Sequence, residues 1–173
     1  VENDGKILMP VLGSGRAQEV MIIVEKLIRE GKLPKIPVYM DGILSYITAI
    51  HTAYPEFLNR NIRKQIFHKD NNPFLSDIFV KVGSKKEREQ IMDKKGSCLI
   101  LATSGMLVGG PSVEYLKALS GNKNNALIFS CYQGEGSLGR RILNGVKDIV
   151  FKESGKNKIY PLKLDVHKVE ITG

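Results

Sequence analysis

The sequence predicts an α/β domain in which a mainly parallel sheet is covered by helices on both faces. Short apolar runs alternate with segments of helical periodicity, and a glycine-rich turn follows most of the apolar runs. The 173 residues suit one domain with a substantial core. No apolar stretch approaches the roughly 20 residues that a membrane span needs, so we expect no membrane partner.

The first expected unit is a strand, a turn and a helix. Residues 7–12 form an apolar run, and Gly13, Ser14 and Gly15 follow it at once. Between residues 17 and 28, apolar side chains recur at 3.6-residue spacing and predict one buried helix face. Gly31 stands where a helix C-terminal cap is expected.

The same pattern continues along the chain. Further strands are expected at residues 36–40, 78–82, 98–102 and 126–131. Further helices are expected around residues 46–50 (interrupted by Pro55), 57–67, 84–96, 112–119 and from 138 onward. Ser84 and Glu87 form a capping box, and Pro111 fits the first position of its helix. After Gly145 the pattern predicts strands at 149–152 and 162–171, with a polar loop at 153–158 between them.

The charge balance favours a polyanionic partner. Lysine and arginine number 26 against 18 acidic residues, which gives a net charge of +8. The two cysteines, Cys98 and Cys131, lie in apolar runs. We interpret them as small buried side chains in a reducing cytosol, and we expect a cytoplasmic protein.

The carboxyl ends of the predicted strands are the expected ligand-binding edge. Loops rich in glycine, serine and threonine let backbone N–H groups face a phosphate, although the same residues also suit plain tight turns. Four such loops at one edge favour a phosphate-binding rim. The candidate RNA-binding or phosphate-binding residues are Ser14, Arg16, Thr103, Ser104, Gly105, Gln133, Glu135, Gly136 and Arg140.

Two arginines strengthen this hypothesis. Arg16 and Arg140 are placed in the first turn of their predicted helices, where a cation opposes the helix dipole. A phosphate bound there would be attracted by both the arginine and the helix N-terminus. The alternative is that Arg16 pairs with Glu19 or Glu135. The role of Arg141 stays open.

Several other kinds of site are not supported by the spacing of residues. A third glycine is lacking after Gly13 and Gly15, so a dinucleotide site is weakly supported, with Asp41 as its one acidic candidate. No P-loop occurs. His51, His68 and His167 are isolated from one another, and we expect them to be structural, solvated and strand residues respectively. We therefore expect no catalytic residue and no metal ligand in this chain.

Five segments in order resemble the β-CASP domain of metallo-β-lactamase-fold ribonucleases. They are most like the archaeal homologues of the cleavage and polyadenylation specificity factor endonuclease. The segments are GKILMPV with GRAQE, VYMDG, AIHTAYPE, ATSGML with GGPS, and YQGEGSLGR.

The resemblance implies a Rossmann-like lid domain that holds single-stranded RNA. Its partner would be a metallo-β-lactamase domain of the same parent chain, which would carry two zinc ions and hydrolyse the phosphodiester bond with a metal-activated hydroxide. On this view, residues 1–153 are the β-CASP domain, and residues 154–173 return toward the metallo-β-lactamase domain, which lies outside the sequence. The expected function is RNA 3′-end processing or decay, with this chain inactive by itself.

Two other functions stay open from the sequence. The first is a non-catalytic RNA-binding or scaffold subunit of the same family. The second is an independent nucleotide-binding α/β domain.

Overall fold

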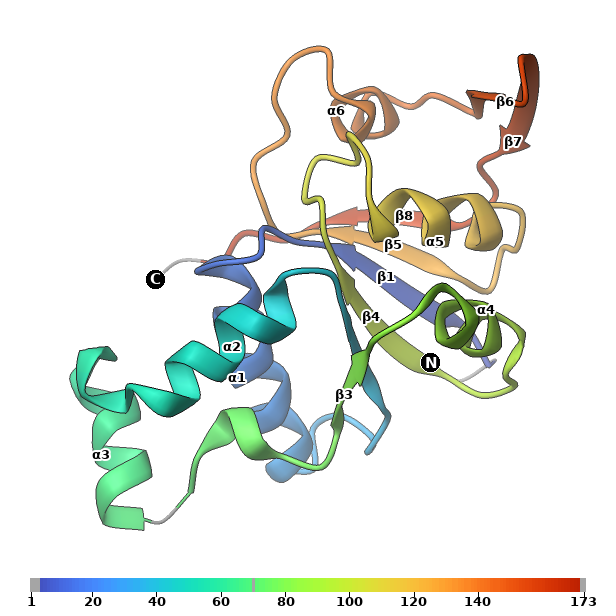
Figure 1. Cartoon of the computed structure of the whole chain (residues 1–173). Helices are drawn as coiled ribbons and strands as arrows, with labels where there is room; N and C mark the ends of the chain where they lie inside the picture. Colours follow the sequence, from blue (N-terminus) through green and yellow to red (C-terminus); the bar gives the residue numbers. More distant parts are fainter. Residues whose placement is uncertain (1–3, 70, 172–173) are drawn as a thin grey trace.

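A six-stranded parallel sheet forms the centre of the molecule (Figure 1). The computed structural model describes residues 4–69 and 71–171. The strand order is β3-β2-β4-β1-β5-β8, so the chain crosses over repeatedly between strands, as expected for a doubly wound α/β fold. The sheet strands are β1 (Lys6–Pro10), β2 (Val38–Asp41), β3 (Phe79–Val82), β4 (Cys98–Ala102), β5 (Ala126–Phe129) and β8 (Asp165–Lys168).

Helices cover both faces of the sheet, which confirms the predicted fold class. The helices are α1 (Arg16–Arg29), α2 (Leu44–Ala53), α3 (Arg60–Lys69), α4 (Lys85–Asp93), α5 (Pro111–Leu119) and α6 (Leu138–Leu143). Helices α1, α2 and α3 belong to one layer, and α4, α5 and α6 to the other.

The central strand β4 shows how the sequence builds two cores. Its side chains alternate between the faces of the sheet. Leu99 and Leu101 pack with α1 and α2, whereas Ile100 packs with α5 through Leu116. All five residues of the strand are buried, which explains why it is a continuous apolar run in the sequence.

The region after Gly145 differs from the prediction. The strand expected at 149–152 is present as β6 (Asp148–Glu153). The polar loop expected at 153–158 is instead mostly strand, because β7 (Lys156–Pro161) pairs antiparallel with β6 and only residues 154 and 155 form the turn. Ser154 and Gly155 both have positive φ, as a tight two-residue hairpin turn requires. Most of β7 is exposed, so its composition is polar and gives little sign of a strand.

Two further boundaries also differ. The strand predicted at 162–171 is confined to β8, which ends at Lys168. The helix predicted at 57–67 is a short 3-10 helix, η1 (Pro55–Phe57), followed by α3. The Asn59 side chain accepts hydrogen bonds from the backbone N–H groups of Asn61 and Ile62, which sets the later start of α3. A second 3-10 helix, η2 (Pro73–Leu75), precedes β3.

The expected domain division lies within this structure. The boundary at 153/154 falls at the turn of the β6–β7 hairpin, and β8 extends the main sheet by pairing with β5. Residues 172–173, part of the expected returning segment, lie outside the described residues. In the described part of the chain, no helix is both long and apolar enough to cross a membrane.

Candidate nucleic-acid interface

The carboxyl ends of the parallel strands meet at one edge of the sheet, and a pocket of about 340 Å³ lies there. It is formed by the start of α1, the segment after β5, helix α6 and the segment after β8. The lining residues are Arg16, Ser130, Cys131, Tyr132, Gln133, Arg140, Leu143, Lys168, Val169, Glu170 and Ile171. Three of the nine predicted site residues, Arg16, Gln133 and Arg140, therefore lie in one pocket.

Arg16 is the first residue of α1, and its guanidinium has two partners. The Nη1 atom of Arg16 lies 2.5 Å from Glu19 Oε2 and 2.8 Å from the backbone oxygen of Ile171. The alternative pairing with Glu19 is therefore present. Because the side chain stays 31% exposed, Arg16 both fixes the segment after β8 and presents positive charge to the pocket.

Arg140 is exposed, and no carboxylate in residues 4–69 or 71–171 forms an ion pair with it. It lies on α6, whose first turn is capped by Ser137: the hydroxyl accepts from the Arg140 N–H at 3.1 Å and donates to the Gly134 oxygen at 2.7 Å. Helix α6 has only six residues, so its first and last turns overlap. The prediction that Arg140 opposes a helix dipole does not hold for so short a helix. The reason to expect that Arg140 can bind a ligand is therefore its exposure to solvent alone.

Of the eight lining residues that sequence reasoning missed, Lys168 and Tyr132 are the two best suited to contact a polyanionic ligand. Lys168 ends β8 and lies 3.3 Å from Glu170, and both side chains are exposed. Tyr132 follows β5 and is 72% exposed, so its ring is accessible at the pocket. Lys168 was missed because residues 154–173 were expected to return toward a metallo-β-lactamase domain, whereas β8 pairs with β5 and brings Lys168 to this edge.

Gln133 is buried, which does not fit the expectation that its side chain faces RNA. Its Nε2 atom donates to the backbone oxygens of Gly105 at 2.9 Å and Cys131 at 3.2 Å. A Cβ atom at Gly139 would overlap the Gln133 Oε1 atom, so α6 packs directly on this amide. Gln133 therefore joins the loop after β4, the segment after β5 and α6, and acts as a support of the pocket.

The loop after β4 is likewise used for internal contacts. The Ser104 hydroxyl donates to the Gly109 oxygen at 3.2 Å and accepts from the Val108 N–H at 3.1 Å. Gly105 is buried against the segment that follows β1, and Thr103 lies so close to Gly42 that a Cβ atom added to Gly42 would overlap the Thr103 hydroxyl oxygen. These three predicted residues hold the strand ends together and do not line the pocket.

The remaining predicted residues are exposed near this edge. Ser14 lies in the loop between β1 and α1, and Glu135 and Gly136 lie between β5 and α6. None of the three lines the pocket.

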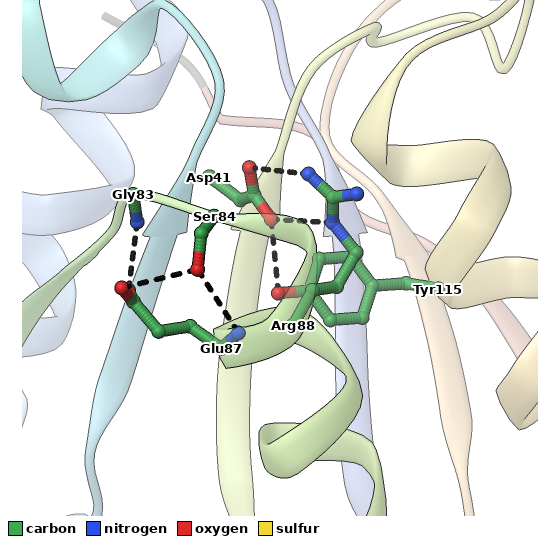
Figure 2. Close-up of polar contacts among 6 residues, drawn as sticks. All are labelled: Asp41, Gly83, Ser84, Glu87, Arg88 and Tyr115. Carbon is green, nitrogen blue, oxygen red and sulfur yellow. Dashed lines mark hydrogen bonds and ion pairs between the residues drawn. The ribbon is translucent and has the colours of Figure 1, made fainter.

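Asp41, at the end of β2, is held in a buried polar network (Figure 2). Arg88 from α4 donates to both carboxylate oxygens, at 2.8 and 3.1 Å, and the Tyr115 hydroxyl from α5 donates at 3.1 Å. The hydrogen bond to Asp41 raises the pKa of Arg88, and burial raises the pKa of Tyr115 far above its ordinary value. Because its partners occupy the carboxylate, Asp41 does not suit the ribose-binding role considered from the sequence.

The same close-up confirms Ser84 as the predicted N-cap of α4, and the Glu87 carboxylate reaches back to the Gly83 N–H one residue before the position expected for a capping box (Figure 2). The Glu87 N–H donates to the Ser84 hydroxyl at 3.2 Å, and the Glu87 carboxylate accepts from the Gly83 N–H at 2.8 Å. The cap fixes the start of the helix that carries Arg88.

The side chains that the structure describes form no cluster suited to zinc. Across residues 4–69 and 71–171, no three histidine, cysteine, aspartate or glutamate side chains gather where they could hold a metal ion. The Nδ1 atom of His51 lies 2.8 Å from the Ile47 oxygen, and its ring packs edge-on to Phe74. His68 is exposed on α3, and His167 pairs with Ile128 within the sheet.

Comparison with known proteins places this fold in a family. Residues 17–142 match the Beta-Casp domain family. The chain is 50% identical over 170 residues to the transcription termination factor FttA of Methanocaldococcus jannaschii, covering 98% of this chain and 27% of that protein. It is 45% identical over 171 residues to FttA of Thermococcus kodakarensis, covering 98% of this chain and 26% of the relative. The chain thus spans about a quarter of the length of these relatives. It belongs to the Beta-Casp domain family.

Proposed function

We propose that this chain is the RNA-holding β-CASP part of a metallo-β-lactamase-type ribonuclease that acts in transcription termination. Its family membership and the function for which its archaeal relatives are named support this role. This proposal narrows the expectation of RNA 3′-end processing or decay to the process for which the relatives are named. Single-stranded RNA would cross the pocket formed by Arg16, Arg140 and Lys168.

The observation that carries the proposal is the exposed, unpaired Arg140 at the pocket edge. Among the described pocket residues, Arg16 has Glu19 and Lys168 has Glu170, whereas Arg140 has no carboxylate partner. A phosphate would supply that partner. The exposed ring of Tyr132 adds a surface on which a base can stack beside the cations, as in other single-strand binding sites.

Hydrolysis would depend on residues outside this chain. A metallo-β-lactamase partner domain would bring two zinc ions, which activate water for phosphodiester cleavage when bound. This chain would hold and orient the RNA backbone. We therefore expect the 173-residue chain to bind RNA without cutting it.

The test compares the wild-type chain with Arg140→Gln/Lys168→Gln. We expect the variant to bind a fluorescein-labelled oligouridylate about tenfold more weakly, which corresponds to roughly 1.4 kcal/mol. The slope of log affinity against log salt concentration should fall by about 0.7 for each phosphate that the variant no longer neutralises. Fluorescence anisotropy at several salt concentrations measures both quantities.

The matched control is Lys85→Gln/Lys86→Gln, which removes two exposed cations from α4. Equal binding by the pocket variant and this control would reject the pocket as the RNA site. Zinc analysis of the natural-length protein separates the ribonuclease from the scaffold alternative, since a protein without zinc would favour an RNA-binding scaffold.

A further inference from the structure

Helix α3 presents a second basic surface, away from the pocket at the strand ends. Figure 1 shows α3 at the lower left and α6 at the top of the view. The exposed face of α3 borders a pocket of about 400 Å³. We call the lining residues the α3 surface: Glu56, Arg60, Arg63, Lys64, Phe67 and His68.

The spacing of these residues places them on one side of the helix. Positions 60, 63, 64, 67 and 68 follow the i, i+3, i+4, i+7, i+8 pattern of a single helix face. The opposite face is anchored, because Ile62 is buried and Ile66 packs against the same core cluster. The core therefore holds the helix in an orientation that turns its cations toward solvent.

Arg60, Arg63 and Lys64, the three cations of the α3 surface, are exposed. In the described residues, Arg60, Arg63 and Lys64 form no ion pair, and the α3 sequence RNIRKQIFHK contains no acidic residue. Arg63 Nη1 lies 3.4 Å from the backbone oxygen of Glu56.

The cations of helix α1, unlike those of the α3 surface, are paired with acidic side chains. Its cations Arg16, Lys26 and Arg29 each lie within ion-pair distance of a glutamate. Exposed charges that are left without partners favour binding to a polyanion, since their electrostatic attraction is not satisfied within the protein.

Exposed aromatic rings lie within and beside this row of cations. Phe67 belongs to the α3 surface and is 60% exposed, and Phe57 in η1 is 84% exposed. Phe57 and Tyr54 line a neighbouring apolar pocket of about 420 Å³. Cations that follow a phosphate backbone, together with rings on which bases stack, are the two elements of sequence-tolerant single-strand binding.

We infer that the α3 surface is a second binding site for single-stranded RNA, with Arg60, Arg63 and Lys64 on the phosphates and Phe67 stacked on a base. RNA is favoured over an acidic protein because the exposed ring lies among the cations and can meet a base between contacted phosphates. This site shares its ligand with the proposed function but uses none of the residues of the strand-end pocket. An RNA long enough to reach both sites would bind more tightly than one that fills either site alone.

The first experiment measures binding of a fluorescein-labelled oligouridylate of about 30 nucleotides, longer than one site needs. We expect Arg60→Gln/Arg63→Gln/Lys64→Gln to weaken binding at least about tenfold. The matched control, Lys85→Gln/Lys86→Gln/Lys95→Gln, removes the same charge from lysines elsewhere on the surface and should change binding less than about twofold. Circular dichroism and thermal melting identify any variant that fails to fold.

The second experiment tests stacking, with inorganic polyphosphate as a ligand that has no bases. Phe67→Ala should weaken oligouridylate binding several-fold and leave polyphosphate binding unchanged, while Phe67→Tyr should restore RNA binding. If Phe67→Ala binds both ligands as the wild type does, no base stacks on Phe67, and the inference of a specific RNA site is overturned in favour of an acidic protein partner.

The two proposals fail in different ways. If the α3 triple variant matches its control while Arg140→Gln/Lys168→Gln is weakened, the α3 inference is overturned and the strand-end pocket stands. The reverse result would overturn the strand-end pocket and keep the α3 surface.

Discussion

Two charged regions at the same sheet edge differ in burial and in what their charges contact. At the end of β2, Asp41 is buried and receives three hydrogen bonds from Arg88 and Tyr115. At the ends of β5 and β8, Arg140 and Lys168 are exposed around a pocket. Position at the carboxyl edge of an α/β sheet therefore does not by itself make a residue a ligand contact. A buried charge must have its partner within the protein, whereas an exposed charge can take one from solution.

The largest expected loss of stability comes from removing a partner of the buried Asp41 carboxylate. Arg88→Ala leaves the Asp41 carboxylate buried with only the Tyr115 hydroxyl, and we expect a loss of about 3 kcal/mol in the free energy of unfolding. This is the lower end of the range for broken buried pairs, because the Arg88 side chain is 17% exposed and water can partly replace it. Urea denaturation followed by circular dichroism measures the change.

Lys85→Ala on the same helix is the control, because its exposed pair with Glu89 is worth about 0.5 kcal/mol or less. RNA binding by folded Arg88→Ala should match the wild type. A loss of stability no greater than that of Lys85→Ala would show that the Asp41 network is not structural.

A smaller loss of stability is expected at the contact between Gly139 and Gln133, the buried residue that supports the pocket. At Gly139, an added Cβ would overlap the Gln133 Oε1 atom and meet Phe129 Cε1 at 3.1 Å. Gly139→Ala must displace this buried amide, and we expect a loss of about 2 kcal/mol in the free energy of unfolding. Because Gln133 holds the segment that leads to Arg140, RNA affinity should fall as well.

Gly121→Ala is the matched substitution, since no atom lies within 4 Å of its Cβ position. Thermal melting and RNA anisotropy on both variants separate local overpacking from the general effect of replacing glycine. If Gly139→Ala keeps the wild-type affinity, the pocket does not depend on Gln133.

The sequence predicted the sheet, its helical layers and the edge that carries the pocket. These features follow from periodicity and apolar runs, as in β4, which is buried along its whole length. Strand β7 was missed because exposed strands carry polar residues that resemble a loop, whereas β6 matches the strand expected at 149–152. The position of β8 was missed because strand order depends on packing between distant segments, which a single sequence does not encode locally.

The site was predicted in part for the same reason. The sequence does not show whether the polar groups of glycine, serine and glutamine in a turn face solvent or the protein. Gln133 and Ser104 face the protein, with hydrogen bonds to backbone groups, whereas Arg140 faces solvent. The resemblance identified the family, but only the structure separates the buried residues that support the pocket from the exposed residues that a ligand can reach.

The smallest predicted effect concerns the second donor to Asp41. Tyr115→Phe removes the hydroxyl that donates at 3.1 Å, and at neutral pH we expect a loss of about 1 kcal/mol in the free energy of unfolding. The dependence on pH has a definite sign. Burial raises the pKa of Tyr115, so above pH 10, the ordinary value for tyrosine, the unfolded chain releases a proton that the folded chain keeps. The wild type should therefore lose about 1.4 kcal/mol per pH unit from this group above about pH 10.

Tyr115→Phe lacks this contribution, so the stability difference between the two proteins should shrink and then reverse as the pH rises. The other five of the six tyrosines are present in both proteins and cancel in the comparison. Tyr132→Phe, which alters an exposed ring, should follow the wild type across the range. Urea denaturation at pH values from about 8 to 11 measures all three, with the ordinary tyrosine pKa inside the interval. If the difference in the free energy of unfolding between wild type and Tyr115→Phe stays constant with pH, the Tyr115 hydroxyl is not shielded from solvent. It would then resemble the exposed groups beside Arg140.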